Sequence, residues 1–156
     1  MDKQNSNSPY KVKAESVSGY RARNMFAMSP RKSTTKSWLP NPDKDGGLSN
    51  TIATMVNSAR NTQAVVTAQK IGRDQQKFTF SWSFLSKSEW ESLLKFWDKH
   101  FIFRLYYYDP VAGTIAYHNF YISDRTYEYF DIDSDGYPTA YINCKASIVD
   151  TGEKNG

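Results

Sequence analysis

The stretch from Gln76 to Phe84 constrains the fold of this chain more than any other part of the sequence. Aromatic residues alternate there with polar ones: one set is Phe78, Phe80, Trp82 and Phe84, and the other is Lys77, Thr79, Ser81 and Ser83. Successive side chains of a β-strand point to opposite faces, so this alternation predicts a strand with one buried aromatic face. We therefore expect the fold to be built on a β-sheet.

A helix is predicted directly after this strand, over about 86–99. Ser86 and Glu89 have the spacing of a capping box, in which each side chain binds the other residue's backbone N–H. Four apolar side chains then fall at helical spacing on a single stripe: Trp90, Leu93, Leu94 and Trp97. Such a stripe indicates a helix that packs one face against the sheet.

Further strands are predicted where β-forming residues lie between turns rich in Pro, Gly and Asp. They cover 62–71, 101–108, 114–123, 126–130 and 137–149, with 101–108 and 114–123 paired as a hairpin. The predicted class is α+β, mainly β: an antiparallel β-sandwich or split barrel with one flanking helix, plus an extended N-terminal arm.

The charge of the chain divides it into two predicted parts. Residues 1–50 hold nine Lys and Arg against four Asp and Glu, whereas residues 51–156 are close to neutral. The first fifty residues are also polar and interrupted by Pro and Gly, a composition that buries little apolar surface. We therefore predict a basic, extended arm over 1–50 and a β-rich core domain over 51–156.

The sequence gives little support for catalysis or for a bound metal. The run from Asp131 to Gly136 matches the first half of a calcium loop, but Ile142 stands where the loop needs a bidentate Glu, so an acidic turn is favoured. His100 and His118 have no zinc-site spacing, and Cys144 falls on the apolar face of its strand. We therefore expect no enzyme activity, no catalytic residue, no metal and no cofactor.

The arm is the predicted site of interaction with other molecules. Its candidate contact residues are Tyr10, Tyr20, Arg21, Arg23, Phe26, Arg31, Lys32 and Trp38. Aromatic side chains dominate many protein interfaces, and the cations would add complementarity. Binding of phosphate backbones by the same cations, with bases stacked on the aromatics, is the alternative. The modest charge density makes nucleic acid the less favoured partner.

Several segments together resemble small tail proteins of bacteriophages and prophages. They are Asn57–Asn61, Gln69–Arg73, Lys77–Trp82 leading into Leu85–Trp90, and Tyr108–Gly113 running into Phe120–Asp124. The resemblance covers about residues 55–152. It implies the tail-tube-like fold, whose β-sandwich or split barrel with a flanking helix forms rings through sheet-edge pairing, with arms that lace neighbouring subunits together.

The expected function is therefore that of a virion structural protein of a phage tail, most like a distal tail, baseplate or tube-like ring subunit. Fifty N-terminal residues exceed what a minimal tail subunit needs, which leaves the exact component open. The expected partners are copies of itself in a ring and other tail or baseplate proteins, with assembly in the host cytoplasm. No apolar run approaches the ~20 residues of a membrane span. A carbohydrate-binding β-sandwich that uses the tyrosines of 106–108 is a further alternative.

Overall fold

The computed structural model describes residues 25–43, 46–60 and 62–153. Nine strands and one helix follow one another along the chain: β1 (Ala27–Pro30), β2 (Ser37–Trp38), β3 (Leu48–Ala53), β4 (Val56–Arg60), β5 (Val66–Lys70), β6 (Gln75–Ser86), α1 (Lys87–Lys99), β7 (Ile102–Asp109), β8 (Thr114–Ile132) and β9 (Pro138–Asp150). Seven strands form one antiparallel sheet in the order β2–β1–β7–β8–β9–β6–β3, and β4 and β5 pair separately. The predicted class, mainly β with antiparallel sheets and one helix, is confirmed.

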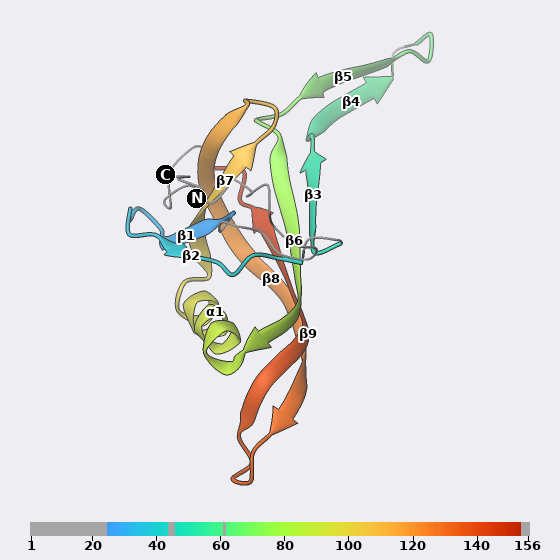
Figure 1. The fold of residues 1–156 in the computed structure, drawn as a ribbon. Helices are drawn as coiled ribbons and strands as arrows, with labels where there is room; N and C mark the ends of the chain where they lie inside the picture. Colours follow the sequence, from blue (N-terminus) through green and yellow to red (C-terminus); the bar gives the residue numbers. More distant parts are fainter. Residues whose placement is uncertain (1–24, 44–45, 61, 154–156) are drawn as a thin grey trace, which may run out of the picture.

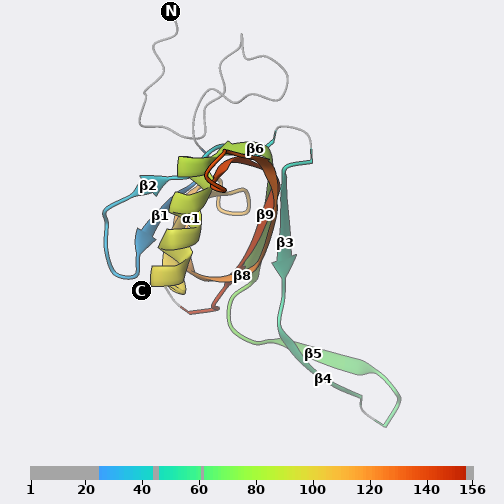
Figure 2. The same cartoon turned by 90° about the horizontal axis from the view of Figure 1, so that it is seen from below.

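The core lies between the sheet and α1, and Figure 2 shows the sheet curling around it with the helix across the open side. Alternate residues of each central strand point inward, including Phe80 of β6, Phe103 of β7 and Ile148 of β9, all fully buried. The aromatic rings pack edge to face and stacked: Trp90 and Trp97 of α1 lie 6.2 Å apart between centroids. Such pairs add about 0.5–1.5 kcal/mol each beyond the area that they bury.

The helix begins and ends where the sequence predicts. Ser86 is the N-cap and forms a full capping box with Glu89, which satisfies two N–H groups that the first turn would leave unpaired. Trp90, Leu93 and Trp97 of the predicted stripe are buried. The helix therefore covers the aromatic face of β6, and Trp82 packs 6.0 Å from Trp90 between ring centroids.

The predicted hairpin is confirmed: β7 and β8 pair from Asp109–Thr114 to Ile102–Tyr121. The two strands predicted over 114–123 and 126–130 form one long strand, β8, that bends through several register shifts against β9. Phe84 differs from the prediction. It is exposed and packs edge to face on Phe130 of β8, whereas the next residue, Leu85, is buried in the core, so the buried face of β6 changes at this point.

Part of the segment predicted as an arm lies in the sheet. β1 pairs with β7, and its residues Ala27 and Met28 are buried, so this short segment completes the core beside α1. Leu39 is buried as well, and its N–H donates to the carbonyl of Phe26. Nothing divides the described residues into domains, so the boundary at residue 50 stays a prediction.

The chain passes from β2 at one edge of the sheet to β3 at the other. On the way, Asp43 hydrogen-bonds to Ser81 and Ser83 of β6, and the indole of Trp82 donates to the carbonyl of Pro40. A Cβ at Gly47 would clash with the backbone of Asp43, so the turn that leads into β3 requires glycine. This crossing fixes β3 against β6.

Two hairpins extend from opposite ends of the molecule, as Figure 1 shows: the β4–β5 hairpin at one end and the joined ends of β8 and β9 at the other. Within the described part of the chain, no helix has the length and apolar character needed to span a membrane.

Candidate assembly interface

The sheet does not close, so it presents two edges. β3 forms one of them, pairing with β6 on its inner side from Leu48–Phe80 to Ala53–Gln75. Four of its six residues are exposed, and no described strand pairs with its outer side. An edge strand of this kind carries backbone N–H and C=O groups that another chain can pair with.

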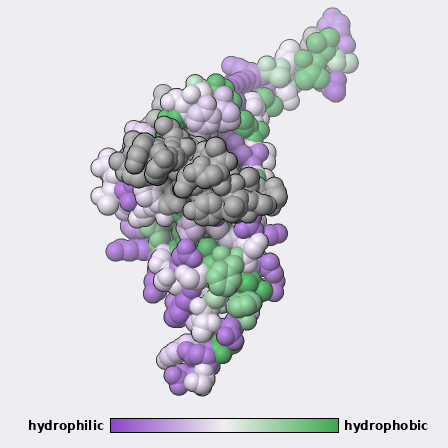
Figure 3. All heavy atoms as spheres, viewed as in Figure 1, coloured by the Kyte–Doolittle hydropathy of each residue, from purple (hydrophilic) through white to green (hydrophobic). Residues whose placement is uncertain are grey.

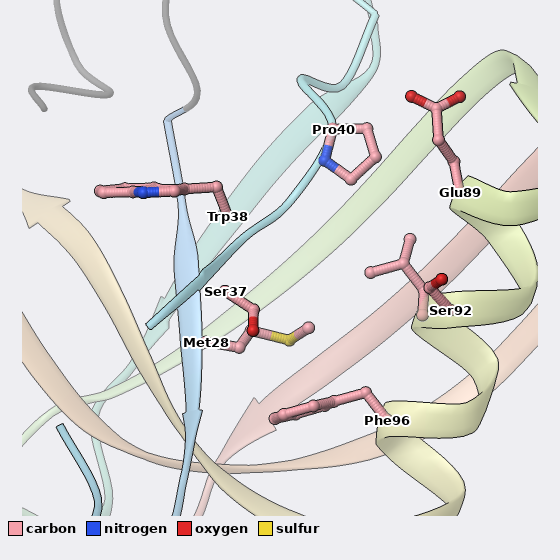
Figure 4. A pocket seen from close by; sticks show the side chains of 8 residues that line it. Met28, Ser37, Trp38, Pro40, Glu89, Ser92 and Phe96 are labelled. Carbon is pink, nitrogen blue, oxygen red and sulfur yellow. The ribbon is translucent and has the colours of Figure 1, made fainter. Parts of the chain in front are cut away.

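The other edge is formed by the two residues of β2, and a groove lies between this edge and α1. Figure 4 shows Trp38 and Pro40 on one side of the groove and Glu89, Ser92 and Phe96 of the helix on the other. The groove has a volume of about 360 Å³. The ammonium of Lys36 lies 4.6 Å from the ring centroid of Tyr106 and 5.9 Å from that of Trp38. This edge therefore combines an exposed indole with a cation.

The β4–β5 hairpin (residues 54–72) projects from the body and is highly exposed. All ten residues of its two strands are exposed. Five large apolar side chains of this hairpin are about half exposed: Met55, Val56, Val65, Val66 and Ile71. Figure 3 shows hydrophobic residues gathered on this projection. A lone two-stranded hairpin is at best marginally stable in water, so these exposed apolar side chains make the hairpin a candidate contact surface.

The base of this hairpin is anchored by charged groups. The guanidinium of Arg73 donates to both carboxylate oxygens of Asp150, at 2.6 Å each, and also to the carbonyl of Glu153. Asp74 accepts from Thr54 and pairs with Lys70, and these two hydrogen bonds lower the pKa of its carboxyl group. These contacts fix the position of the residues from which the hairpin projects.

The opposite projection, the β8–β9 tip (residues 123–143), is acidic and aromatic. β7 pairs with β8 only as far as Tyr121, so the outer side of β8 has no described partner strand beyond that point. Large exposed apolar side chains of the tip are Tyr127, Tyr129, Phe130, Ile132 and Tyr137. These side chains give the tip exposed apolar surface.

The run Asp131–Gly136 at the end of the tip forms a turn, as the sequence favoured. The carboxylate of Asp133 accepts hydrogen bonds from the backbone N–H of Asp135 and of Tyr137, at 2.9 and 3.0 Å. Aspartate commonly stabilises a turn in this way. Across the described residues, His, Cys, Asp and Glu side chains form no group of three or more that could hold a metal ion.

Cys144 and His118 are the two side chains considered as possible reactive groups. Cys144 is buried, and desolvation raises the pKa of its thiol to about 11, which suppresses the reactive thiolate. Burial, together with the nearby charge of Arg73, lowers the pKa of His118. Cys144 therefore acts as a small apolar core residue, as its place on the strand predicts.

The predicted contact residues have different positions. Tyr10, Tyr20, Arg21 and Arg23 lie outside the described residues, so their role stays a prediction. Phe26 is buried in this subunit's own core, packed edge to face on Phe78 and Phe80, because β1 joins the sheet. Arg31 forms an ion pair with Glu153, Lys32 is exposed, and Trp38 is 39% exposed at the β2 edge.

Two surfaces were missed from the sequence: the β4–β5 hairpin and the β8–β9 tip. The first was predicted only as a strand over 62–71, and the second as a strand end and a turn. Apolar residues on both faces of a strand usually indicate burial on both sides within one chain. The close run of Tyr127, Tyr129, Phe130 and Ile132 before an acidic turn was the available signal for the tip.

Comparisons with known proteins give a structural likeness but no sequence match. No protein-family model matches the chain, and no curated protein matches it. Among solved structures, the chain is similar to one from the tail of an empty GTA particle with C6 symmetry, at 11% sequence identity and a TM-score of 0.49. The alignment covers 83% of this chain and 91% of that chain.

Proposed function

We propose that this protein is a structural subunit of a phage-type tail and that it works by forming a ring with copies of itself. The observation that supports this proposal is the open sheet with its two edges. A sheet with two exposed edges can pair with itself, and a ring removes every free edge by closure. The β core with a flanking helix is the architecture that the resemblance to phage tail proteins implies, which supports the tail as the place of the ring.

The two edges differ in a way that favours pairing between unlike edges. β3 offers an extended backbone, while the β2 edge offers Trp38, Lys36 and the groove beside α1. A contact between two different surfaces forms a ring when its rotation closes. Backbone hydrogen bonds along β3 would provide affinity, and Trp38 with Arg31 and Lys32 would provide the side-chain contacts.

A proline at the outer side of β3 tests the edge contact. The carbonyl of Gly47 accepts from the N–H of Ser81, so the alternation of an antiparallel ladder turns the N–H of Asn50 and Ile52 away from β6. Ile52→Pro therefore removes an outward donor and keeps the inner ladder intact. The matched control is Ile52→Ala, which removes the same exposed side chain but keeps the N–H.

Native mass spectrometry and negative-stain images of the purified protein provide the readout. We expect closed rings of fixed copy number for the wild type and for Ile52→Ala, and monomers with unchanged circular dichroism for Ile52→Pro. Rings formed equally well by Ile52→Pro would contradict edge pairing. A wild type that remains monomeric at high concentration would contradict the proposed function itself.

Experiments on intact particles test which component of the tail this protein forms. Quantitative mass spectrometry and labelling of particles that carry this protein should locate it in the tail. A small fixed copy number at the tip would identify a distal ring or baseplate component, and many copies along the tail would identify a tube protein. Absence from the particles would refute a virion role.

A further inference from the structure

We infer that copies of this protein also join end to end, with the β8–β9 tip of one copy docked on the β4–β5 hairpin of the next. The inference rests on the proposed self-assembly and names the two surfaces that meet in a second, independent contact. The partner is a second copy of this chain, recognised by charge and by exposed apolar side chains.

The two surfaces lie at opposite ends of the molecule. In Figure 1 the β4–β5 hairpin projects from the upper end and the β8–β9 tip from the lower end. A copy displaced along this long axis therefore brings its tip toward the hairpin of the neighbour. Repetition of such a contact between unlike ends produces an open stack.

The charges of the two ends are opposite. Residues 54–72 contain Arg60 and Lys70 and no Asp or Glu, and Lys70 pairs with Asp74 at the base of the hairpin. The tip, residues 123–143, contains five acids against the single base Arg125; the acids are Asp124, Glu128, Asp131, Asp133 and Asp135, all exposed. Tip would repel tip, and hairpin would repel hairpin, so the charges select the contact between unlike ends.

Both ends also expose apolar surface that the body of the subunit does not cover. The side chains of Phe130 and Tyr137 on the tip are 59% and 64% exposed, and those of Val56 and Val65 on the hairpin are 53% and 54% exposed. Docking would remove these side chains from water on both partners at once. Aromatic residues ringed by charges are typical of the buried centre of a protein interface.

The end-to-end contact would be made by side chains more than by backbone pairing between strands of the two copies. β8 shows register shifts against β9 between Ile122 and Arg125, and again between Tyr129 and Ile132. Such irregularities bend a strand and hinder pairing along its free edge. The ring contact along β3 and the end-to-end contact at the tip are therefore distinct in kind, and each can be altered alone.

Charge reversal with rescue tests the inference in the full chain. The tip variant is Asp131→Lys with Asp135→Lys, which spares the turn carboxylate of Asp133. The hairpin variant is Arg60→Glu with Lys70→Glu, and the swap variant combines all four changes. Lys95→Glu with Lys99→Glu is the matched control, because both lysines are exposed on α1, outside the two projecting ends, and the change in net charge equals that of the hairpin variant.

Electron micrographs and sedimentation velocity in 50 and 500 mM salt measure the stacking of rings. We expect wild-type stacks that shorten with salt, a loss of end-to-end affinity of about tenfold or more in each reversal, and recovery in the swap variant. Rings that never stack, or stacks that survive both reversals, would overturn the inference and leave the proposed function intact. Loss with the tip variant alone, without rescue, would exclude the hairpin as the partner. Monomers throughout would overturn both proposals.

Discussion

Arg73 and Asp150 form a bidentate ion pair that joins the residues just before β6 to the end of β9. The carboxylate of Asp150 is fully buried, while a quarter of the Arg73 side chain remains exposed. Asp150 also accepts from the backbone N–H of Gln76 and of Gly152. The pair thus ties the base of the β4–β5 hairpin to the final strand.

Arg73→Ala is expected to lower the free energy of unfolding by about 3 kcal/mol, because it leaves a buried carboxylate without its charged partner. Urea unfolding followed by tryptophan fluorescence measures the change. The control is Lys87→Ala, which removes an exposed pair with Glu91 and should change stability by no more than about 0.5 kcal/mol. Equal effects of the two substitutions would contradict a stabilising role for the buried pair.

Ser86→Ala is expected to destabilise the fold by about 1 kcal/mol, since it removes the side-chain half of the capping box at the start of α1. Thermal unfolding monitored at 222 nm provides the test. Ser92→Ala is the matched control: Ser92 is exposed in the same helix, and alanine has the higher helix propensity. The capping role would be refuted by a loss at position 92 as large as that at position 86.

Trp97→Ala is expected to cost about 3–5 kcal/mol, because the side chain is 1% exposed and packs between the helix and the sheet. Its indole N–H also points to the sulfur of Met28, at 3.2 Å, so the substitution loosens β1 as well. Phe101→Ala removes a ring that is 59% exposed and should change the unfolding free energy far less. Similar losses at both positions in denaturant titrations would count against the described core.

The protein is expected to lose stability as the pH rises from about 9 to 11. Burial raises the pKa of the Cys144 thiol to about 11, and that of Tyr107 rises from the same cause. The unfolded chain releases these protons at lower pH than the folded one, so the unfolded state gains as the pH passes through this window. A thiol reagent at pH 8 should label Cys144 only after unfolding, and rapid labelling of the native protein would contradict its burial.

Local sequence signals predicted the central elements because those signals act within one element. The capping box and stripe fixed α1, and the alternation around Phe80 fixed the face of β6. Turn residues placed the β7–β8 hairpin. β1 and β2 gave no comparable signal. They are short and lie among polar residues. β1 becomes a strand by pairing with β7, a tertiary interaction, and β2 then pairs with β1.

The candidate interface was less accessible from sequence. Phe26 is buried and Trp38 is exposed, although both were predicted as contact residues. Which of them is exposed depends on how the surrounding segment joins the sheet. The same holds at Phe84, which continues the buried alternation in sequence but is exposed, while the next residue, Leu85, is buried in the core. Periodicity gives the two faces of a strand, whereas the elements packed against the strand decide which face is covered at each level.

The pairing of β1 with β7 has a consequence for the timing of synthesis. Ala27 leaves the ribosome early, yet its partner Tyr106 follows only after β6 and α1 have been made. The β2 edge cannot form before then, while β3 needs only β6. A nascent chain therefore lacks one of the two edges until most of it has been translated, which delays mutual recognition between subunits until each is nearly complete.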